Sequence, residues 1–326
     1  MTTGVLLMTY GAPRDEADLP RYLAAVRGGR EPAAELVAEM RRRYALIGGS
    51  PLIRITRAQA AALETELGSG HVVGAGMRYS DPSIGDAVRD LVERGAERIV
   101  GICMSPQWSP RLMGGYADAL GGATSNAGVP SAMAPAWHRE PMFIAATVER
   151  VRAALHDADA TTAIVLTAHS LPKRVFESEP EYIAQLHETA DLVASAAGLD
   201  REQWHWAYQS AGHTQEEWLR PDLKELFPSL AALGAREVLV VPVQFLSDHL
   251  EVLYDLDIAA AEEARAAGLR YRRVEMANTQ PAFIRALAGI TRATGDDARR
   301  TGDEAGQNIS AAPPPSNRPS HRSFAP

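Results

Sequence analysis

"AIVLTAHSLPKRV", residues 163–175, passes from an apolar run into a small polar patch that holds one histidine, and it breaks at Pro172. A short apolar run that is bounded by turn residues is typical of a strand buried in a parallel sheet. Its polar end falls at the carboxyl end of the strand, where open α/β sheets bind their ligands. His169 is therefore a candidate site residue, and the alternative is a structural histidine satisfied by hydrogen bonds.

Similar apolar runs recur along the chain and alternate with amphipathic segments. The predicted strands are residues 5–9, 72–75, 98–104, 163–167, 204–207 and 237–243. The predicted helices include residues 33–47, 83–94, 142–154, 182–197 and 250–267. Strands and helices that alternate in this order predict an α/β fold with parallel sheets that carry helices on both faces.

A weak internal repeat relates the two halves of the chain. The stretches "VLLMTYGAP" and "IVLTAHSLP" superpose so that Tyr10 falls on His169 and Pro13 falls on Pro172. The repeat predicts two related doubly wound domains, and chance similarity is the alternative. If the strand ends of the two domains face each other, Tyr10 and His169 look into one cleft from opposite walls.

Composition and the repeat together set the predicted domain boundaries. We expect an N-terminal domain over residues 1–145, a second domain over 146–280, a C-terminal helix over 281–292 and a disordered tail over 293–326. The tail ends in "PPPSNRPSHRSFAP", which is too polar and too rich in proline to bury a core.

The overall composition excludes several classes of protein. The 326 residues are 46% hydrophobic and 23% charged, which is typical of a globular protein. No apolar run approaches the roughly 18 residues of a spanning helix, and the N-terminal stretch lacks the basic start of a signal peptide. The net charge of −8 argues against nucleic acid and against a polybasic membrane anchor. The single cysteine, Cys103, fits a reducing compartment, so we expect a soluble cytoplasmic protein.

A second informative stretch is "VPVQFLSDHLEVLYDLDI", which begins at residue 241. Glu251 and Asp255 are four residues apart and share one face of the predicted helix, and Asp248 lies three residues before Glu251. Carboxylates this close repel each other, which raises at least one pKa and suits the row to passing protons or holding a divalent cation. The alternative is a capping box, in which Asp248 and Glu251 satisfy N–H groups of the first helical turn.

Other motifs limit the kinds of site that the sequence can contain. His249 competes with His169 for a functional role, but no histidine pair has the spacing of a zinc site. The stretch "GAGMRY" begins like a dinucleotide fingerprint but has Tyr79 where the third glycine belongs, and no Walker A or G-x-S-x-G motif occurs. The segments "VRGGREP" (26–32) and "RRRYALIGGSPL" (41–52) place arginines beside glycines, which suits bidentate capture of carboxylates. A solvated helix surface is the alternative for both segments.

Six of these motifs together resemble the ferrochelatases. In the second half they are "TAHSLP", "YQSAGHTQEEWLRPDL" and "PVQFLSDHLEVLYDLD", and in the first half "MTYGAP", "VRGGREP" and "RYALIGGSPL". They occur in the family's order from residue 4 to about residue 290. The resemblance implies a chelatase-like fold of two Rossmann-like domains around a porphyrin cleft. It also implies a lyase that inserts Fe²⁺ into a porphyrin in haem biosynthesis.

The resemblance also assigns catalytic and metal-binding roles. His169 and Glu251 would lie on one side of the macrocycle, where His169 would take pyrrole protons, bind the incoming metal, or both, and would share these tasks with Glu251. Asp255 would continue an acidic track along a helix that contains a π-type distortion. Ala259 stands where some relatives have a further acid, and Tyr10 would contact the iron from the opposite face.

The family's porphyrin-binding positions match six residues: Tyr10, Arg27, Arg43, Tyr44, Ser50 and Tyr116. The tyrosine and the arginine-rich loops resemble the branch that uses coproporphyrin III, whose four propionates offer more anionic groups than the two of protoporphyrin IX. The expected reaction is therefore insertion of Fe²⁺ into coproporphyrin III to form coproheme. The alternatives are a protoporphyrin IX ferrochelatase and a non-catalytic tetrapyrrole-binding carrier.

The resemblance further implies the partners of the protein. The expected substrates are coproporphyrin III and Fe²⁺, with no other cofactor. Some relatives hold a [2Fe–2S] cluster with four cysteines, which a chain with one cysteine cannot do. The product would pass to a coproheme decarboxylase, and we expect neither a nucleic-acid partner nor a membrane span.

Overall fold

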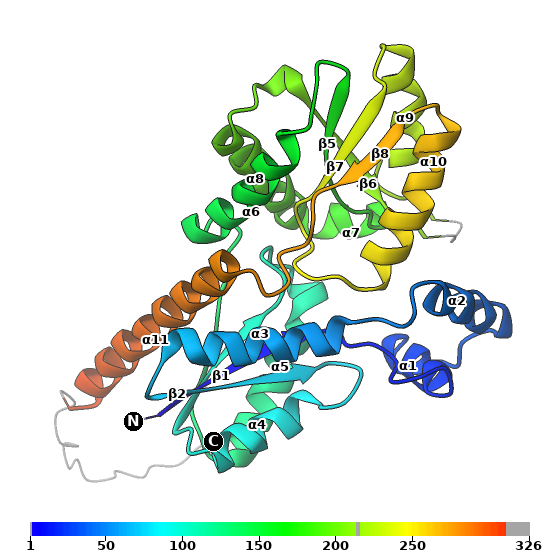
Figure 1. Ribbon diagram of the computed structural model, residues 1–326. Coiled ribbons are helices and arrows are strands. Elements are labelled where there is room, and N and C mark those ends of the chain that lie inside the picture. The colour runs from blue at the N-terminus through cyan, green and yellow to red at the C-terminus, as the bar shows by residue number, and fades with distance from the viewer. Residues whose placement is uncertain (1, 213–215, 311–326) are drawn as a thin grey trace, which may run out of the picture.

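Two four-stranded parallel sheets form the centre of the structure, a computed structural model that describes residues 2–212 and 216–310 (Figure 1). The first sheet has the order β2-β1-β3-β4 and comprises β1 (Thr3–Thr9), β2 (His71–Met77), β3 (Arg98–Cys103) and β4 (Ser131–Met133). The second has the order β6-β5-β7-β8 and comprises β5 (Thr162–His169), β6 (Trp204–Gln209), β7 (Glu237–Pro242) and β8 (Arg270–Arg273). The two halves therefore share one strand order, and the predicted α/β fold with two doubly wound units is confirmed.

The helices of the first half are α1 (Leu19–Val26), α2 (Ala34–Leu46), α3 (Leu52–Leu67), α4 (Ile84–Glu93) and α5 (Pro110–Ala127). Those of the second half are α6 (Pro141–Leu155), α7 (Lys173–Ser178), α8 (Pro180–Ala197), the 3₁₀ helix η1 (Arg201–Gln203), α9 (Leu223–Ala232), the π-helix η2 (Glu251–Ala260), α10 (Ala261–Ala266) and α11 (Pro281–Ser310). None of the helices in the described part of the chain is both long enough and apolar enough to cross a membrane.

The central strands β1 and β5 are the two strands of the internal repeat. All seven residues of β1 are buried, because helices cover both faces of the sheet and leave no solvent-facing side. Tyr10 follows β1 directly and His169 ends β5, so each lies at the carboxyl end of its strand. The edge strands β4 and β8 were not predicted, because they are only three and four residues long and lack an apolar run.

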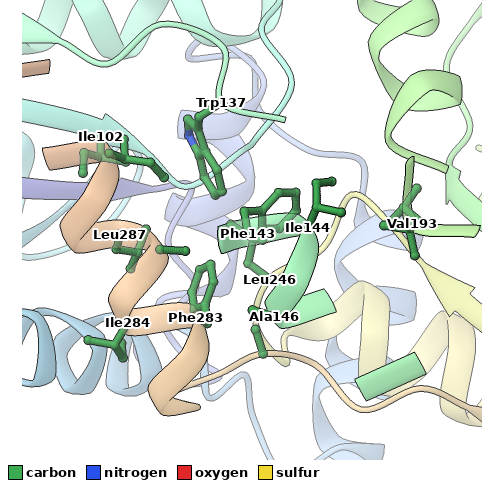
Figure 2. Close-up of a cluster of buried hydrophobic side chains, with 14 of the residues drawn as sticks. Ile102, Trp137, Phe143, Ile144, Ala146, Val193, Leu246, Phe283, Ile284 and Leu287 are labelled. Carbon is green, nitrogen blue, oxygen red and sulfur yellow. The ribbon is translucent and has the colours of Figure 1, made fainter. Parts of the chain in front are cut away.

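Two helices cross between the halves and join them. Helix α6 follows β4 but packs against α8, whereas α11 follows β8 but returns to pack against α3, β3 and β4 (Figure 1). The two helices also pack on each other, and one cluster of apolar side chains runs from Ile102 of β3 through Phe143 and Phe283 to Val193 of α8 (Figure 2). The predicted boundary at residue 145 thus falls inside α6, and the predicted C-terminal helix completes the first half.

The C-terminal helix is longer than predicted. We expected it over 281–292 with disorder from residue 293, but α11 continues to Ser310, and residues 311–326 lie outside the described part of the chain. The reason lies in the contacts of its fourth turn, because Thr294 is buried and Arg98 donates a hydrogen bond to the carbonyl of Gly295 at 3.3 Å. The sequence beyond contains good helix formers and no proline before residue 313.

The predicted helix over 250–267 is divided into two kinds of helix. Its first ten residues form the π-helix η2, and only the remainder, α10, is α-helical. Most π-helical segments are single turns, and they occur frequently at functional sites. The π-helical geometry therefore indicates that η2 has a functional role in addition to its role in packing.

Candidate active site

A cavity of about 480 Å³ lies where the carboxyl ends of the two sheets meet. Its lining includes residues that follow β1, β3 and β7, the last residue of β5, and the start of η2. Helices α1 and α2 form a small lobe with its own apolar cluster, and this lobe contributes another part of the lining. A larger hollow of about 920 Å³ lies between α3 and α4 along β2, away from these strand ends. We place the site in the smaller cavity because it collects strand ends from both halves.

His169 is held with one ring nitrogen free. Its Nδ1 lies 2.5 Å from the carbonyl oxygen of Ser170, which can only accept, so Nδ1 carries the proton and Nε2 bears the lone pair of the neutral ring. The main-chain N–H of His169 donates to Oε1 of Gln244 at 2.8 Å, and the Gln244 amide donates in turn to the hydroxyl of Tyr182 at 2.7 Å. Backbone and imidazole are thus fixed together, and Nε2 is the atom available to a ligand.

Glu251, the first residue of η2, lies between two imidazoles. Its Oε2 is 3.8 Å from Nε2 of His169 and 3.6 Å from Nε2 of His249. The Nδ1 of His249 lies 2.9 Å from the carbonyl of Ser247, so this ring has the same tautomer as that of His169. Burial raises the pKa of Glu251, but the positive charge that His169 has when it is protonated and the contact with His249 outweigh it and hold the pKa at about 2. Burial lowers the pKa of His249, and its contact with Glu251 outweighs this effect and raises it.

The capping-box alternative for Asp248 and Glu251 is wrong. Asp248 pairs with Asn278 instead, because its main-chain N–H donates to the Asn278 side chain at 2.9 Å and its Oδ2 accepts from the Asn278 amide at 2.8 Å. The π-helix begins without a side-chain cap. The Glu251 carboxylate therefore contacts the imidazoles of His169 and His249. The two histidines lie at the same site, so His249 is not an alternative to His169.

Asp255 and Arg43 meet outside the cavity. The Nη1 of Arg43 lies 3.3 Å from Oδ1 of Asp255, and its Nε donates to Glu39 at 2.7 Å. Burial raises the pKa of Asp255 above its ordinary value. Arg43 is not among the residues that line the cavity, and its contact with Asp255 places it at the junction of α2 and η2. One π-helical turn further on, Ala259 supplies no carboxylate.

Tyr10 contributes to the cavity lining from the end of β1. The residue is 42% exposed, and its ring meets the Tyr79 ring edge to face with the ring centroids 4.7 Å apart. Burial raises the pKa of Tyr10, which keeps the phenol protonated in the free protein. Tyr44, Ser50 and Tyr116 line the same cavity as predicted.

Not all predicted residues come together. Arg27 is exposed at the end of α1, directly after Val26, which does line the cavity. The apolar bed of the cavity was not predicted from the sequence, and it includes Met8, Leu23, Val26, Met40, Cys103, Met104 and Met113. The signal that could have found part of it is the position of Cys103 and Met104 at the end of β3, next to β1. His169, Glu251 and Tyr10 line the same cavity as this apolar bed.

The fold is that of solved chelatase structures. SirB from Bacillus subtilis with Fe³⁺ has the same architecture, with a TM-score of 0.58 and 13% identity over 92% of this chain and 98% of that chain. CbiX, described as the terminal enzyme for siroheme biosynthesis in denitrifying bacteria, matches with a TM-score of 0.54 and 14% identity over 90% of this chain and 99% of that chain. At such low identities these two structures establish the fold alone.

The family follows from sequence comparison. A family model described as ferrochelatase matches residues 2–294. A ferrochelatase of Deinococcus radiodurans is 40% identical over 297 residues, which are 88% of this chain and 94% of that protein. A coproporphyrin III ferrochelatase of Bacillus subtilis is 35% identical over 305 residues, which are 88% of this chain and 96% of that protein. The chain belongs to the ferrochelatase family, and the resemblance in its motifs is confirmed.

Proposed function

We propose that this ferrochelatase inserts Fe²⁺ into coproporphyrin III to form coproheme in haem biosynthesis. The observation that carries the proposal is the pairing of His169 Nε2 with Glu251 at 3.8 Å in a cavity that Tyr10 also lines. The Bacillus subtilis relative and one from Geobacillus kaustophilus, 37% identical over 301 residues, are both named coproporphyrin III ferrochelatases and support this choice of substrate.

The proposed chemistry begins with proton removal. Two pyrrole N–H bonds break as one Fe²⁺ enters, so two protons leave for each ion. A neutral imidazole is a suitable acceptor near neutral pH, and Nε2 of His169 is the free nitrogen. The planar ring shields its N–H groups, so the cavity has to hold it bent toward the base, with strain supplied by contacts to the rest of the macrocycle.

Glu251 and Asp255 complete the proposed removal of the proton. An imidazolium at His169 would gain a carboxylate partner at once, because Glu251 is ionised over the physiological range. Asp255 lies next along η2 and offers a further acceptor for the departing proton. We propose that His169 and Glu251 also contact the incoming iron, and that Tyr10 contacts it from the opposite face once it is in the ring.

A hollow lined by arginines lies beside the cavity. It supports coproporphyrin III as the substrate, because that porphyrin carries four propionate groups. This hollow, of about 620 Å³, shares Tyr44 and Ser50 with the cavity and is lined by Arg14, Arg41 and Arg54. Arg41 pairs with Glu16 at 2.7 Å and Arg14 approaches Asp15 at 3.5 Å. Arg54 has no acidic partner within the described part of the chain. We propose that its guanidinium takes a propionate carboxylate at the rim of the macrocycle.

The test is metal insertion with two porphyrins. The protein should insert Fe²⁺, or Zn²⁺ as a probe, into coproporphyrin III with a higher kcat/KM than into protoporphyrin IX. A reversed preference would favour the protoporphyrin IX ferrochelatase. Tight porphyrin binding without insertion of either ion would favour the tetrapyrrole carrier, which has no use for a base beside a carboxylate.

Three further expectations belong to the same proposal. Fe²⁺ is substrate, and no iron–sulfur cluster accompanies it, because Cys103 alone cannot supply four thiolates. The proposed next step is transfer of coproheme to a coproheme decarboxylase. A cytoplasmic location remains a prediction from the sequence.

A further inference from the structure

Helix α5 receives part of its N-terminal cap from the other half of the protein. Ser109 precedes the helix, and its hydroxyl accepts a hydrogen bond from the main-chain N–H of Leu112 at 3.0 Å. The N–H of Arg111 donates to Oε1 of Glu179 at 2.8 Å, and the Ser109 hydroxyl donates to Oε2 of the same carboxylate. Two N–H groups of the first turn therefore depend on Ser109 and Glu179 together.

The sequence fixes the corner from which Glu179 reaches α5. Glu179 lies between α7 and α8, and Pro180 is the first residue of α8. A proline disfavours the helical conformation of the residue before it, and Glu179 accordingly has φ −139° and ψ 63°. Helix α7 therefore ends at Ser178, and the carboxylate that follows it is available to α5. The dipole of α5 also favours a negative charge at this end of the helix.

Side chains of α8 also hold the loop that leads into α5. The amide of Gln185 accepts a hydrogen bond from the N–H of Trp108 at 2.8 Å and donates one to its carbonyl at 3.4 Å. One turn further along α8, the hydroxyl of Thr189 accepts from the side chain of Gln107 at 2.9 Å. Gln107, Ser109 and Thr189 are all 0% exposed. The loop and α8 therefore form a buried, hydrogen-bonded contact between the two halves.

Helix α8 contacts the support of the base as well. The hydroxyl of Tyr182, on α8, accepts a hydrogen bond from Gln244 at 2.7 Å, and Gln244 in turn accepts from the main-chain N–H of His169 at 2.8 Å. Helix α5 contributes Met113 and Tyr116 to the lining of the same cavity. One helix of the second half is therefore linked both to His169 and to the part of the cavity that α5 forms.

We propose that Glu179 is a positioning residue that fixes the cavity face of α5 relative to His169 and thereby prepares the cavity for a porphyrin. The proposal rests on the proposed function, which supplies the ligand. Glu179 is not among the residues that line the cavity, so it acts through α5. Without its carboxylate, the first turn of α5 loses a hydrogen-bond acceptor and unwinds more easily, and a porphyrin has to order this turn again when it binds.

The first test compares porphyrin binding with turnover. Glu179→Ala should raise the Kd and the KM for coproporphyrin III about fivefold, the usual effect of losing one helix cap. The kcat at saturating porphyrin and the KM for Zn²⁺ should stay nearly unchanged, because bound porphyrin has already ordered α5. Glu179→Gln should bind like the wild type, since its amide accepts from the Arg111 N–H and donates to the Ser109 hydroxyl. Glu177→Ala, at an exposed position two residues earlier, is the control.

The second test separates this role from a general loss of stability. Asp222 caps α9, where its carboxylate accepts from the N–H of Lys224 at 3.0 Å, and α9 contributes no residue to the cavity lining. Asp222→Ala and Glu179→Ala should both lower the Tm, but only Glu179→Ala should weaken porphyrin binding. Ser109→Ala should weaken it too. Because Ser109 and Glu179 act in one cap, the double variant should lose less affinity than the product of the two single losses.

Each outcome supports or overturns the role of Glu179. An unchanged Kd for coproporphyrin III in Glu179→Ala overturns it, and so does an equal loss of affinity in Asp222→Ala. If Glu179→Ala does not fold, Ser109→Ala gives the same comparison, because it removes the Leu112 cap and the hydroxyl that contacts Glu179. A wild-type protein that binds porphyrin without inserting metal would defeat the proposed function, while the Kd values of the variants would still decide whether Glu179 shapes the cavity.

Discussion

Nε2 of His169 and Oε2 of Glu251 lie 3.8 Å apart, although one residue ends a strand and the other begins a π-helix. The distance is longer than a hydrogen bond, as expected while Nε2 carries a lone pair toward a carboxylate. Protonation of Nε2 turns the same contact into an ion pair. The arrangement therefore places a carboxylate beside the nitrogen that we propose takes a porphyrin N–H proton.

Removal of the base should separate binding from turnover. His169→Ala should retain porphyrin affinity and lose about 10²- to 10⁴-fold in kcat for metal insertion, the usual contribution of a general base. Porphyrin titration by fluorescence and stopped-flow Zn²⁺ insertion measure the two quantities. His156→Ala, at an exposed position far along α6, is the control. Unchanged turnover in His169→Ala would remove His169 from the reaction.

The Glu251 carboxylate should leave a signature in acid stability. Its pKa is about 2 in the folded protein and about 4.5 without the fold. Because the folded pKa is the lower one, its contribution to stability is present above about pH 4.5 and is lost as the pH falls toward 2. Glu251→Gln should flatten the dependence of unfolding free energy on pH in that window. An unaltered profile would mean that the two histidines do not hold the carboxylate ionised.

The same substitution should act on His249. Its pKa is raised by Glu251, so Glu251→Gln should lower it, and NMR titration of the imidazole resonances measures the change. A group with a raised pKa stabilises the fold below its unfolded value and loses this contribution as pH rises through the folded value. His249→Gln should therefore reduce stability below about pH 6.5 more than at pH 9.

Loss of the Tyr10 hydroxyl should change the absorption spectrum of the bound product more than the rate of metal insertion. Tyr10→Phe should spare metal insertion and change the absorption spectrum of bound ferric product, because the iron loses its contact on that face. Tyr79→Phe is the matched control, since its ring packs on Tyr10 at 4.7 Å without being proposed to reach the iron. Identical spectra in wild type and Tyr10→Phe would contradict the contact.

Arg54 should distinguish the two porphyrins. Arg54→Met should raise the KM for coproporphyrin III about two- to fivefold, the usual range for one exposed ionic contact, and leave that for protoporphyrin IX nearly unchanged. Arg57→Met is the control, because Arg57 lies on the same helix and lines the hollow between α3 and α4. Equal effects on both porphyrins would argue against a propionate partner for Arg54.

The crossed helices should make the two halves unfold together. Leu287→Ala on α11 removes a fully buried side chain from the shared apolar cluster and should cost about 2–5 kcal/mol. Leu233→Ala, at a residue that is 81% exposed, should change stability by less than about 0.5 kcal/mol. Calorimetry should show one transition shifted to lower temperature. Two separate transitions would show that the halves are not joined by this cluster.

The sequence by itself determined six of the eight strands in the described part of the chain, the alternation of strands and helices, and the placing of Tyr10 and His169 at strand ends. These features depend on local chemistry, because an apolar run and the turn that closes it lie within a few residues of each other. The family motifs, which are also local, carried the ferrochelatase assignment.

Only the tertiary structure decided which residues meet. It placed Glu251 between His169 and His249, paired Arg43 with Asp255, and sent α6 and α11 across to the opposite halves. Such contacts join residues that are distant in the chain, and the packing of whole helices selects them. The end of α11 was missed for the same reason, because its fourth turn is held by Arg98 of β3, which lies 197 residues before Gly295. Local pattern fixes what each segment becomes, and burial of its apolar face against a distant partner fixes where it lies.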